Sequence, residues 1–382
     1  MRRGLAAGLL AAIVCSCRET PAPELRIGLP AILTGRYAQV SGLPAQLGAR
    51  LAVAELNAAG GVTIGGVAHQ VRLVERDFAD RADAAATATR ALVNLDSVHV
   101  LVGPQFSVHA IAAAGVAEDA HVPLIAPMAS KPSLTQGRRY VFRLAFLDAF
   151  QGEILARYSC ESLSRRKAAV LYDAANPYGQ DIADLFRATF ERCGGRVVAS
   201  ETFTSDRATD FSQQLRRIVA SGADVLLLPN YVHEDSIQVR QARELGFRGQ
   251  FLGSDSWDPP AMRQLPEAQG AVIVGQWDQL LPTIATRRFV ARYRAANQDS
   301  IPRATAALTY DAVMLVADAA RRAGSLDADA LVRAIAATER FEGVASQYRF
   351  AGRQDPERGG VIMIIRAAGE SVINVGPGAT PR

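Results

Sequence analysis

Residues 98–135 read VHVLVGPQFSVHAIAAAGVAEDAHVPLIAPMASKPSLT, and this stretch determines how the rest of the chain is interpreted. Two short apolar runs, at 98–102 and 122–126, each end at a proline-containing break that is followed by a serine. An alanine-rich segment with the composition of a helix lies between them. The pattern predicts a strand, a helix and a second, parallel strand, which is the repeating unit of an α/β sheet.

Two serines follow the ends of these predicted strands. Ser107 stands where an N-cap would begin the predicted helix, and Ser130 follows the second strand. Ligands of open α/β sheets bind at the carboxyl ends of the strands, where helix N-termini offer unpaired amides. Both hydroxyls are therefore candidates for binding a small anionic group such as a carboxylate. The alternative is that each serine only caps a helix or a turn.

The first 17 residues have the composition of an export signal. Two arginines precede a ten-residue apolar run, which is too short to cross a bilayer, and the segment ends in Val-Cys-Ser-Cys17. Cys17 is the predicted lipidation site of a lipoprotein signal peptide spanning 1–17; an uncleaved anchor or a cleavage site without lipid are the alternatives. Residues 18–24 are predicted to form a short tether. No other stretch has the length and hydropathy of a transmembrane helix.

Charge and cysteine content narrow the function classes. The formal net charge is +4, and two of the positive charges belong to the signal segment. Charged residues are interspersed without a basic block, so nucleic acid is not a favoured partner. Outside the signal segment the cysteines are Cys160 and Cys193, an even pair in an exported protein. A disulfide between them is one of two open possibilities, because the sequence does not define their separation.

Strands alternate with helices along the chain in two similar series. The predicted fold is α/β, with two doubly wound parallel-sheet lobes joined by a hinge of several crossings. We expect the first lobe to span 25–145 and to be completed by 278–340, and the second to span 146–277 and to be completed by 341–376. This length is ample for two hydrophobic cores.

Motifs that follow one another from residue 25 to residue 365 carry a family resemblance. They include IGLPAILTGRYAQVSG, AELNAAGGV, VGPQFS, PLIAPMASKPSLT, YVFRLAFLD, YGQD, GADVLLLPNY and LGSDSW. In this order and spacing they resemble the leucine/isoleucine/valine-binding family of type I periplasmic binding proteins, the extracytoplasmic receptors of branched-chain amino acid ABC importers. The resemblance implies a monomeric receptor without cofactor or catalysis, with an ABC permease of the inner membrane as its partner. With the predicted lipid on Cys17, it would be a membrane-anchored periplasmic lipoprotein.

The resemblance also implies which residues bind the ligand. Ser107 and Ser130, with backbone amides around Met128, match the positions that bind the ligand's carboxylate. Tyr178 and Tyr231 match tyrosines that face the ligand from the second lobe; packing at the hinge or in the core is the alternative for both.

Asp255 matches the acidic residue that takes the ligand's ammonium group. Its alternative is a turn-forming role in Ser-Asp-Ser. Donors on one lobe and a carboxylate on the other suit a zwitterion, which would bridge the lobes, whereas a phosphate would meet Asp255 as a like charge.

The sequence departs from the family at two places. Met128 and Ala129 stand where members commonly have an alanine followed by a hydroxyl residue, and Val40 stands near the position of an aromatic residue, with Tyr37 three residues earlier. Met128 would narrow or reshape the pocket. The resemblance implies a branched-chain or other apolar amino acid, or a similar small amphipathic compound, as the ligand. Amides, urea-like compounds and aromatic acids are the alternative ligands, and a ligand sensor on the same fold is the alternative function.

Catalytic and metal-binding patterns are missing from the sequence. It contains no GxGxxG after the first strand, no P-loop, no GxSxG and no HExxH motif. Ser107 and His109 are two residues apart on a predicted helix and would point to different faces. The five histidines are scattered without the spacing of metal ligands. The sequence therefore predicts a binding protein and not an enzyme.

Overall fold

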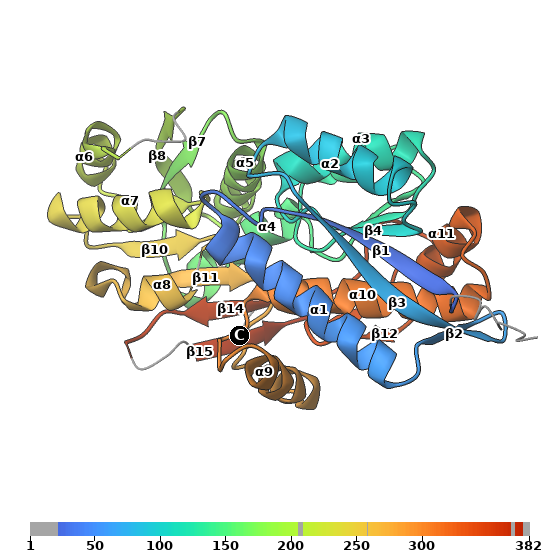
Figure 1. The fold of residues 1–382 in the computed structure, drawn as a ribbon. Coiled ribbons are helices and arrows are strands. Elements are labelled where there is room, and N and C mark those ends of the chain that lie inside the picture. The colour runs from blue at the N-terminus through green and yellow to red at the C-terminus, as the bar shows by residue number, and fades with distance from the viewer. Residues whose placement is uncertain (1–21, 205–208, 258, 368–370, 377–382) are drawn as a thin grey trace, which may run out of the picture.

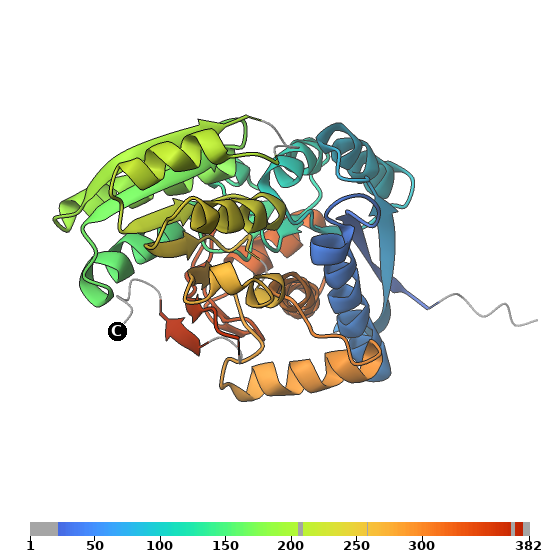
Figure 2. The same ribbon diagram turned by 90° about the vertical axis from the view of Figure 1, so that its left-hand side faces the viewer.

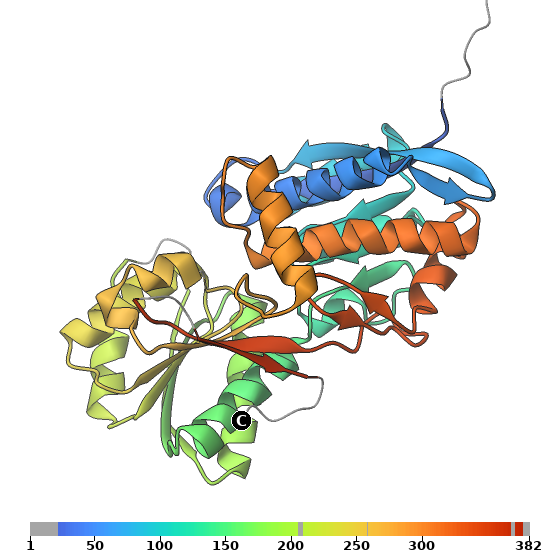
Figure 3. The same ribbon diagram turned by 90° about the horizontal axis from the view of Figure 1, so that it is seen from below.

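A computed structural model describes residues 22–204, 209–257, 259–367 and 371–376 (Figure 1). The predicted signal peptide, the lipidation site Cys17 and the start of the tether (18–21) lie outside the described residues. Two β-sheets, each covered by helices, lie side by side (Figure 3). We call each sheet with its helices a lobe. No helix of the described ranges has the length and hydropathy needed to span a membrane.

The first lobe is built on a six-stranded sheet in the order β2-β3-β1-β4-β5-β6. All its neighbours are parallel except β2 and β3, which pair antiparallel. Helices α1 and α10 pack on one face, and α2 and α3 pack together on the other (Figure 1). Its strands are β1 Glu24–Ala31, β2 Val62–Ile64, β3 Val67–Asp77, β4 Val100–Val102, β5 Leu124–Ala126 and β6 Val141–Arg143. Its helices are α1 Leu43–Ala58, α2 Ala82–Asn94, α3 Ser107–Asp119, α9 Ile284–Ala296, α10 Ala304–Ala323 and α11 Ala328–Ala336.

The second lobe is built on a seven-stranded sheet in the order β15-β14-β11-β10-β9-β7-β8. β14 pairs antiparallel with β11, and β15, at the edge of the sheet, pairs antiparallel with β14 (Figure 2). The strands are β7 Lys167–Asp173, β8 Arg196–Phe203, β9 Val225–Leu228, β10 Gln250–Gly253, β11 Val272–Gly275, β14 Gly360–Ile364 and β15 Ser371–Val375. The helices are α4 Asp148–Arg157, α5 Pro177–Arg192, α6 Ser212–Ala220, α7 Val232–Glu244 and the short α8 Pro259–Arg263. Both sheets are thus mixed but mainly parallel, and the predicted α/β fold of two lobes is confirmed.

The apolar runs of the central strands are long because both faces of each strand are buried. In β7, Ala168 and Val170 belong to one core cluster with Phe186 of α5. The alternating residues Ala169 and Leu171 belong to the other core cluster, which contains residues of α6. Successive side chains of a strand point to opposite faces, so the strand supplies two cores at once.

The chain crosses between the lobes three times, after β6, after β11 and before β14. Arg358, on the third crossing and 4% exposed, donates to the carbonyl of Leu144 on the first crossing (3.2 Å) and to the carbonyl of Gln276 on the second. Its guanidinium also lies 5.6 Å from the ring centroid of Phe146. One side chain therefore joins all three crossings of the hinge.

A short hairpin, β12 Phe341–Glu342 with β13 Gln347–Tyr348, precedes the third crossing. The amides of Val344 and Ala345 and the hydroxyl of Tyr348 donate to the buried carboxylate of Asp311 on α10. The hairpin is therefore held against the first lobe, whereas the sequence assigned residues from 341 onward to the second.

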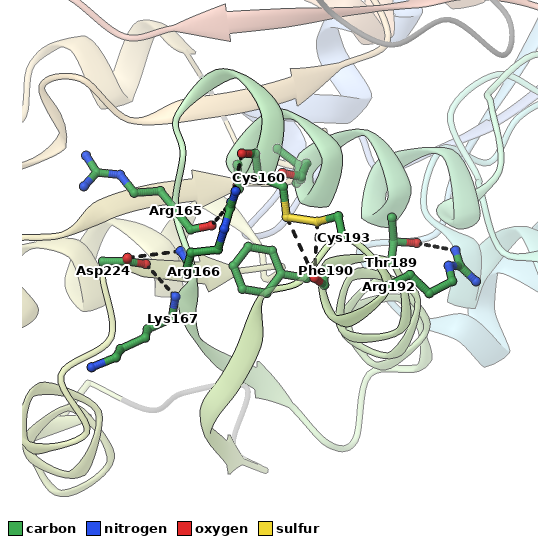
Figure 4. The surroundings of a disulfide bond; sticks show 11 residues. Cys160, Arg165, Arg166, Lys167, Thr189, Phe190, Arg192, Cys193 and Asp224 are labelled. Carbon is green, nitrogen blue, oxygen red and sulfur yellow. Dashed lines mark hydrogen bonds between the residues drawn. A yellow bond between two sulfur atoms is a disulfide. The ribbon is translucent and has the colours of Figure 1, made fainter.

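Cys160 and Cys193 form a disulfide with Cα atoms 6.4 Å apart (Figure 4). Cys160 lies in the π-helical turn Tyr158–Ser162 that extends α4, and Cys193 follows α5. The bond therefore fastens together two adjacent helices of the second lobe.

Replacing both Cys160 and Cys193 with serine is expected to lower the free energy of unfolding by about 2–4 kcal/mol, because the bond closes a loop with a sequence separation of 33 residues. Denaturant unfolding of the double variant and of the reduced parent protein should give the same loss. Ligand affinity should be unchanged, since neither cysteine lines the cavity described below. A double variant as stable as the oxidised parent would show that the disulfide does not contribute to the free energy of unfolding.

Candidate functional site

A cavity of about 110 Å³ lies between the lobes at the carboxyl ends of the parallel strands. Both lobes contribute residues to its wall. All six residues that the sequence analysis assigns to the ligand line it: Ser107, Met128, Ser130, Tyr178, Tyr231 and Asp255. Trp257 lines it as well and also donates from its indole N–H to the carbonyl of Leu228 (2.9 Å).

The first-lobe wall is formed by the start of α3 and by the turn after β5. The helix begins at Ser107 with Phe106 in the N-cap position, so the expectation that Ser107 caps the helix was wrong by one residue. Phe106 takes the extended backbone conformation of a cap without a capping side chain. Ser107 is instead the first helical residue, and its amide is among those that have no acceptor within the helix. Its Oγ accepts from the amide of Lys131 (3.4 Å), which ties the helix start to the turn.

Arg143, a fully buried side chain at the end of β6, holds the turn that carries Ser130 by hydrogen bonds. Its guanidinium donates to the carbonyls of Ala129 (3.2 Å) and Lys131 (2.9 Å) and forms an ion pair with Asp355 (2.6 Å). The bond to Ala129 satisfies a backbone acceptor of the turn, and the bond to Lys131 adds a second donor to a carbonyl that also accepts from the amide of Leu134. They therefore fix where the Ser130 hydroxyl and the neighbouring amides lie.

The second-lobe wall presents the carboxylate of Asp255, on the loop after β10. The hydroxyl of Tyr178 donates to its Oδ1 (2.6 Å), and the side-chain amide of Gln276 donates to its Oδ2. The backbone amide of Asp255 donates to Gln151 Oε1 (2.9 Å). Burial raises the pKa of this carboxyl, whereas the hydrogen bonds from Tyr178 and Gln276 oppose that rise. The loop thus holds an oriented acceptor that faces the donors of the first lobe across the cavity.

A second carboxyl, Asp148 at the start of α4, lies fully buried behind Ser130. Its backbone amide donates to the carbonyl of Ser130 (3.2 Å). Burial is the main cause that raises its pKa to about 7; the nearby carboxylates of Asp255 and Asp181 act in the same direction, and Ser130 and Arg143 oppose them. The sequence analysis did not assign this residue.

Asp148→Asn is expected to stabilise the protein more at pH 8 than at pH 5. The pKa of Asp148 is higher in the folded than in the unfolded protein. Its carboxyl therefore does not lower the free energy of unfolding below about pH 4, and it lowers that free energy increasingly as the pH rises to about 7. Removing the carboxyl should therefore gain roughly 2–3 kcal/mol more at pH 8 than at pH 5, as read from urea unfolding. Asp184→Asn, on the exposed face of α5, is the control and should change stability by less than about 0.5 kcal/mol at both values. A gain that does not depend on pH would contradict the assignment.

An aromatic wall crosses the cleft at one side of the cavity. Tyr37 and Phe106 come from the first lobe, and Tyr231 comes from the second. The ring centroid of Tyr231 lies 5.5 Å from that of Tyr37 and 5.0 Å from that of Phe106, and 5.8 Å from the stacked ring of Tyr178. Contacts at these distances favour the closed arrangement of the lobes. Phe106 was not predicted as a site residue, although it directly precedes the predicted ligand-binding residue Ser107 in the sequence.

Two ion pairs also join the lobes. Arg36, after β1, lies 2.7 Å from Glu234 of α7, and Lys131 lies 2.7 Å from Asp181 of α5. The Glu234 side chain is only 6% exposed, so water screens the first pair little. Both pairs form only when the lobes are together.

The variant Arg36→Gln/Lys131→Gln is expected to weaken ligand binding about 3- to 10-fold, mainly through faster dissociation, because it removes attraction that is specific to the closed arrangement. Stopped-flow dissociation rates at low and high salt measure this effect, which should be smaller in high salt. Arg217→Gln breaks a pair with Glu201 inside the second lobe and should leave the rate unchanged. An unchanged rate in the double variant would show that the pairs do not hold the closed form.

The described part of the chain contains no group of histidine, cysteine, aspartate or glutamate side chains that could hold a metal ion. The cavity has groups suited to binding a ligand: hydrogen-bond donors on one wall, a carboxylate on the other, and aromatic rings between them. A bound molecule with complementary groups at its two ends would contact both lobes at once.

Comparison with known proteins agrees with this architecture. A family described as periplasmic binding protein matches residues 24–370. The leucine-, isoleucine-, valine-, threonine- and alanine-binding protein of Pseudomonas aeruginosa is 27% identical over 327 residues, which cover 83% of each chain. The branched-chain amino acid transporter substrate-binding protein LivJ of Streptococcus pneumoniae, solved in complex with isoleucine, is 32% identical with a TM-score of 0.85, and the match covers 93% of this chain and 100% of that one.

A solute-binding protein of R. palustris, solved in complex with benzoate, shares the fold at 20% identity with a TM-score of 0.81, over 94% of this chain and 97% of that one. Members of the matched family are binding proteins and not enzymes. The chain therefore belongs to the type I periplasmic binding proteins, in the leucine/isoleucine/valine-binding family of ABC-transporter solute-binding proteins.

Proposed function

We propose that this protein binds an α-amino acid between its lobes and delivers it to an ABC permease. The opposed chemistry of the two cavity walls carries the proposal. The start of α3 and the Ser130 turn provide donors for a carboxylate, and Asp255 provides an acceptor for an ammonium group. A zwitterion satisfies both walls at once, so its binding favours the closed arrangement.

The comparisons support the amino-acid head group. The names of two relatives given above state that they bind branched-chain or other small amino acids, and a third protein with the same fold was solved with benzoate. An aromatic acid has a carboxylate but no ammonium group, and it would leave Asp255 without a cationic partner. We therefore favour amino acids as ligands over aromatic acids, amides and urea-like compounds.

A thermal-shift screen of the purified protein against the twenty amino acids, their 2-hydroxy acid analogues, simple amides and benzoate tests the proposal. A ligand at 100 times its dissociation constant should add about 2.7 kcal/mol of stability. Shifts with amino acids and not with hydroxy acids support it. Shifts only with compounds that lack an ammonium group would overturn the role of Asp255, and no shift with any compound would favour a sensor with another ligand.

We further propose that the protein acts outside the cytoplasm as a monomer anchored by lipid on Cys17. The export-type composition of residues 1–17 and the family's location support this. Mass spectrometry of the membrane-extracted protein should find acyl chains on an N-terminal Cys17, and Cys17→Ser should move the protein into the soluble fraction. A parent protein without acyl chains would contradict the anchor.

A further inference from the structure

The ligand cavity contains a group of polar side chains that neither the head-group assignment nor the fold uses. Ser41, Gln105 and Thr305 all line the cavity and belong to the first lobe. They are 1%, 1% and 7% exposed. Among the residues that the structure describes, no hydrogen-bond partner is found for the hydroxyls of Ser41 and Thr305 or for either polar atom of the Gln105 amide. We call these three residues the polar subsite.

Buried polar atoms are nearly always paired, because leaving one unpaired costs as much as a lost hydrogen bond. Four such atoms around one cavity therefore need an explanation. The backbone leaves little freedom to withdraw them: at Gly42, next to Ser41, a Cβ atom would lie 1.7 Å from the carbonyl oxygen of Ile32, so this turn is pressed against the chain after β1. Thr305 is fixed on the first turn of α10. A bound group in the cavity is the partner that their placement indicates.

Resting on the proposed function, we propose that the side chain of the bound amino acid is neutral and polar, and that a carboxamide is its best match. The subsite offers both donors and acceptors: the Gln105 amide has N–H groups and a carbonyl oxygen, and a hydroxyl can serve either way. A carboxylate side chain could only accept and would leave Gln105 Oε1 unpaired. An ammonium side chain could only donate and would leave Gln105 Nε2 unpaired.

The charged residues of the cavity wall agree with a neutral ligand side chain. Asp278 and Arg303 also line the cavity, but each already has an interaction partner within the protein. The unpaired groups are the uncharged ones. An aliphatic side chain would pair none of them. The polar subsite therefore favours an amino acid with a carboxamide side chain over one with a branched aliphatic side chain, which refines the expectation from the family resemblance.

Isothermal titration with two pairs of near-isosteric amino acids tests the inference: asparagine against leucine, and glutamine against methionine. The carboxamide member of at least one pair should bind about 100-fold or more tightly than its apolar partner, because a site built to hydrogen-bond a group strongly rejects an analogue without it. Equal affinities, or tighter binding of leucine and methionine, would overturn the inference while leaving the amino-acid function intact. Failure of every amino acid to bind would instead overturn the proposed function.

Gln105→Leu is the matched variant, since it keeps the size of the side chain and removes both amide functions. It should lower the affinity for the carboxamide ligand about 100-fold and raise that for leucine or methionine, so that the preference reverses. Thr305→Val, which removes only one hydroxyl, should give a smaller loss of about 10-fold. If Gln105→Leu stabilises the ligand-free protein without changing the preference between pair members, water alone pairs the amide and the inference is wrong. Circular dichroism of each variant confirms that it folds.

Discussion

Asp255→Asn is expected to weaken binding of the preferred amino acid by roughly 100- to 1,000-fold, since it leaves a buried ammonium group facing a neutral amide. The substitution keeps the shape of the side chain and one acceptor oxygen for Tyr178, which lies 2.6 Å from Asp255 Oδ1. The fold should therefore survive, and the loss should appear in the dissociation constant measured by isothermal titration.

The 2-hydroxy acid analogue of the same ligand provides the control. The parent protein should strongly prefer the amino acid over the hydroxy acid, and Asp255→Asn should reduce that preference to a few-fold, because the charge that distinguishes the two ligands is gone. If the variant binds the amino acid as tightly as the parent, the ammonium group does not meet Asp255.

Arg143→Met is expected to destabilise the protein by roughly 3–5 kcal/mol, as measured by urea unfolding, and to reduce ligand affinity as well. Methionine fills much of the space but removes every donor: the carbonyl of Ala129 loses its guanidinium partner, the carbonyl of Lys131 keeps only the amide of Leu134, and Asp355 loses its cation. Affinity should fall in the protein that remains folded, because the same turn positions Ser130.

Arg139→Met serves as the comparison. Arg139 lies four residues earlier, and its side chain is 57% exposed in an ion pair with Asp329. Its loss should cost less than about 1 kcal/mol and leave affinity unchanged. Equal effects of the two substitutions would show that the buried guanidinium does not support the turn.

Sequence patterns predicted the alternation of strands and helices because apolar runs and their proline and glycine boundaries are local features. The predicted runs 98–102 and 122–126 contain the observed strands β4 (Val100–Val102) and β5 (Leu124–Ala126). The direction of a strand depends on its distant partners in the sheet, so the antiparallel pairing of β14 and of the edge strand β15 was not predicted. The strands β11 and β15 were not predicted.

Ser107 and Ser130 were predicted because they follow strand ends, and Asp255 was predicted through the family resemblance; all three line one cavity. The supporting residues were not predictable. Arg143 meets Asp355 across 212 positions of sequence, and Arg358 meets Leu144 across 214. Gln105 illustrates the same limit, since only the assembled cavity reveals that its amide lacks a partner.

The three crossings also affect when each lobe can fold during synthesis of the chain. A growing chain presents β1 to β6 long before α10, which covers that sheet, and it presents β7 to β11 long before β14 and β15, which complete the other. Arg358, which joins the crossings, emerges later than most of both lobes. Neither lobe can close its core as an independent early unit, so folding is a late event of nearly the whole chain. We expect a chain with this connectivity to complete its fold only after β14 and β15 have been synthesised, which is compatible with the export proposed above.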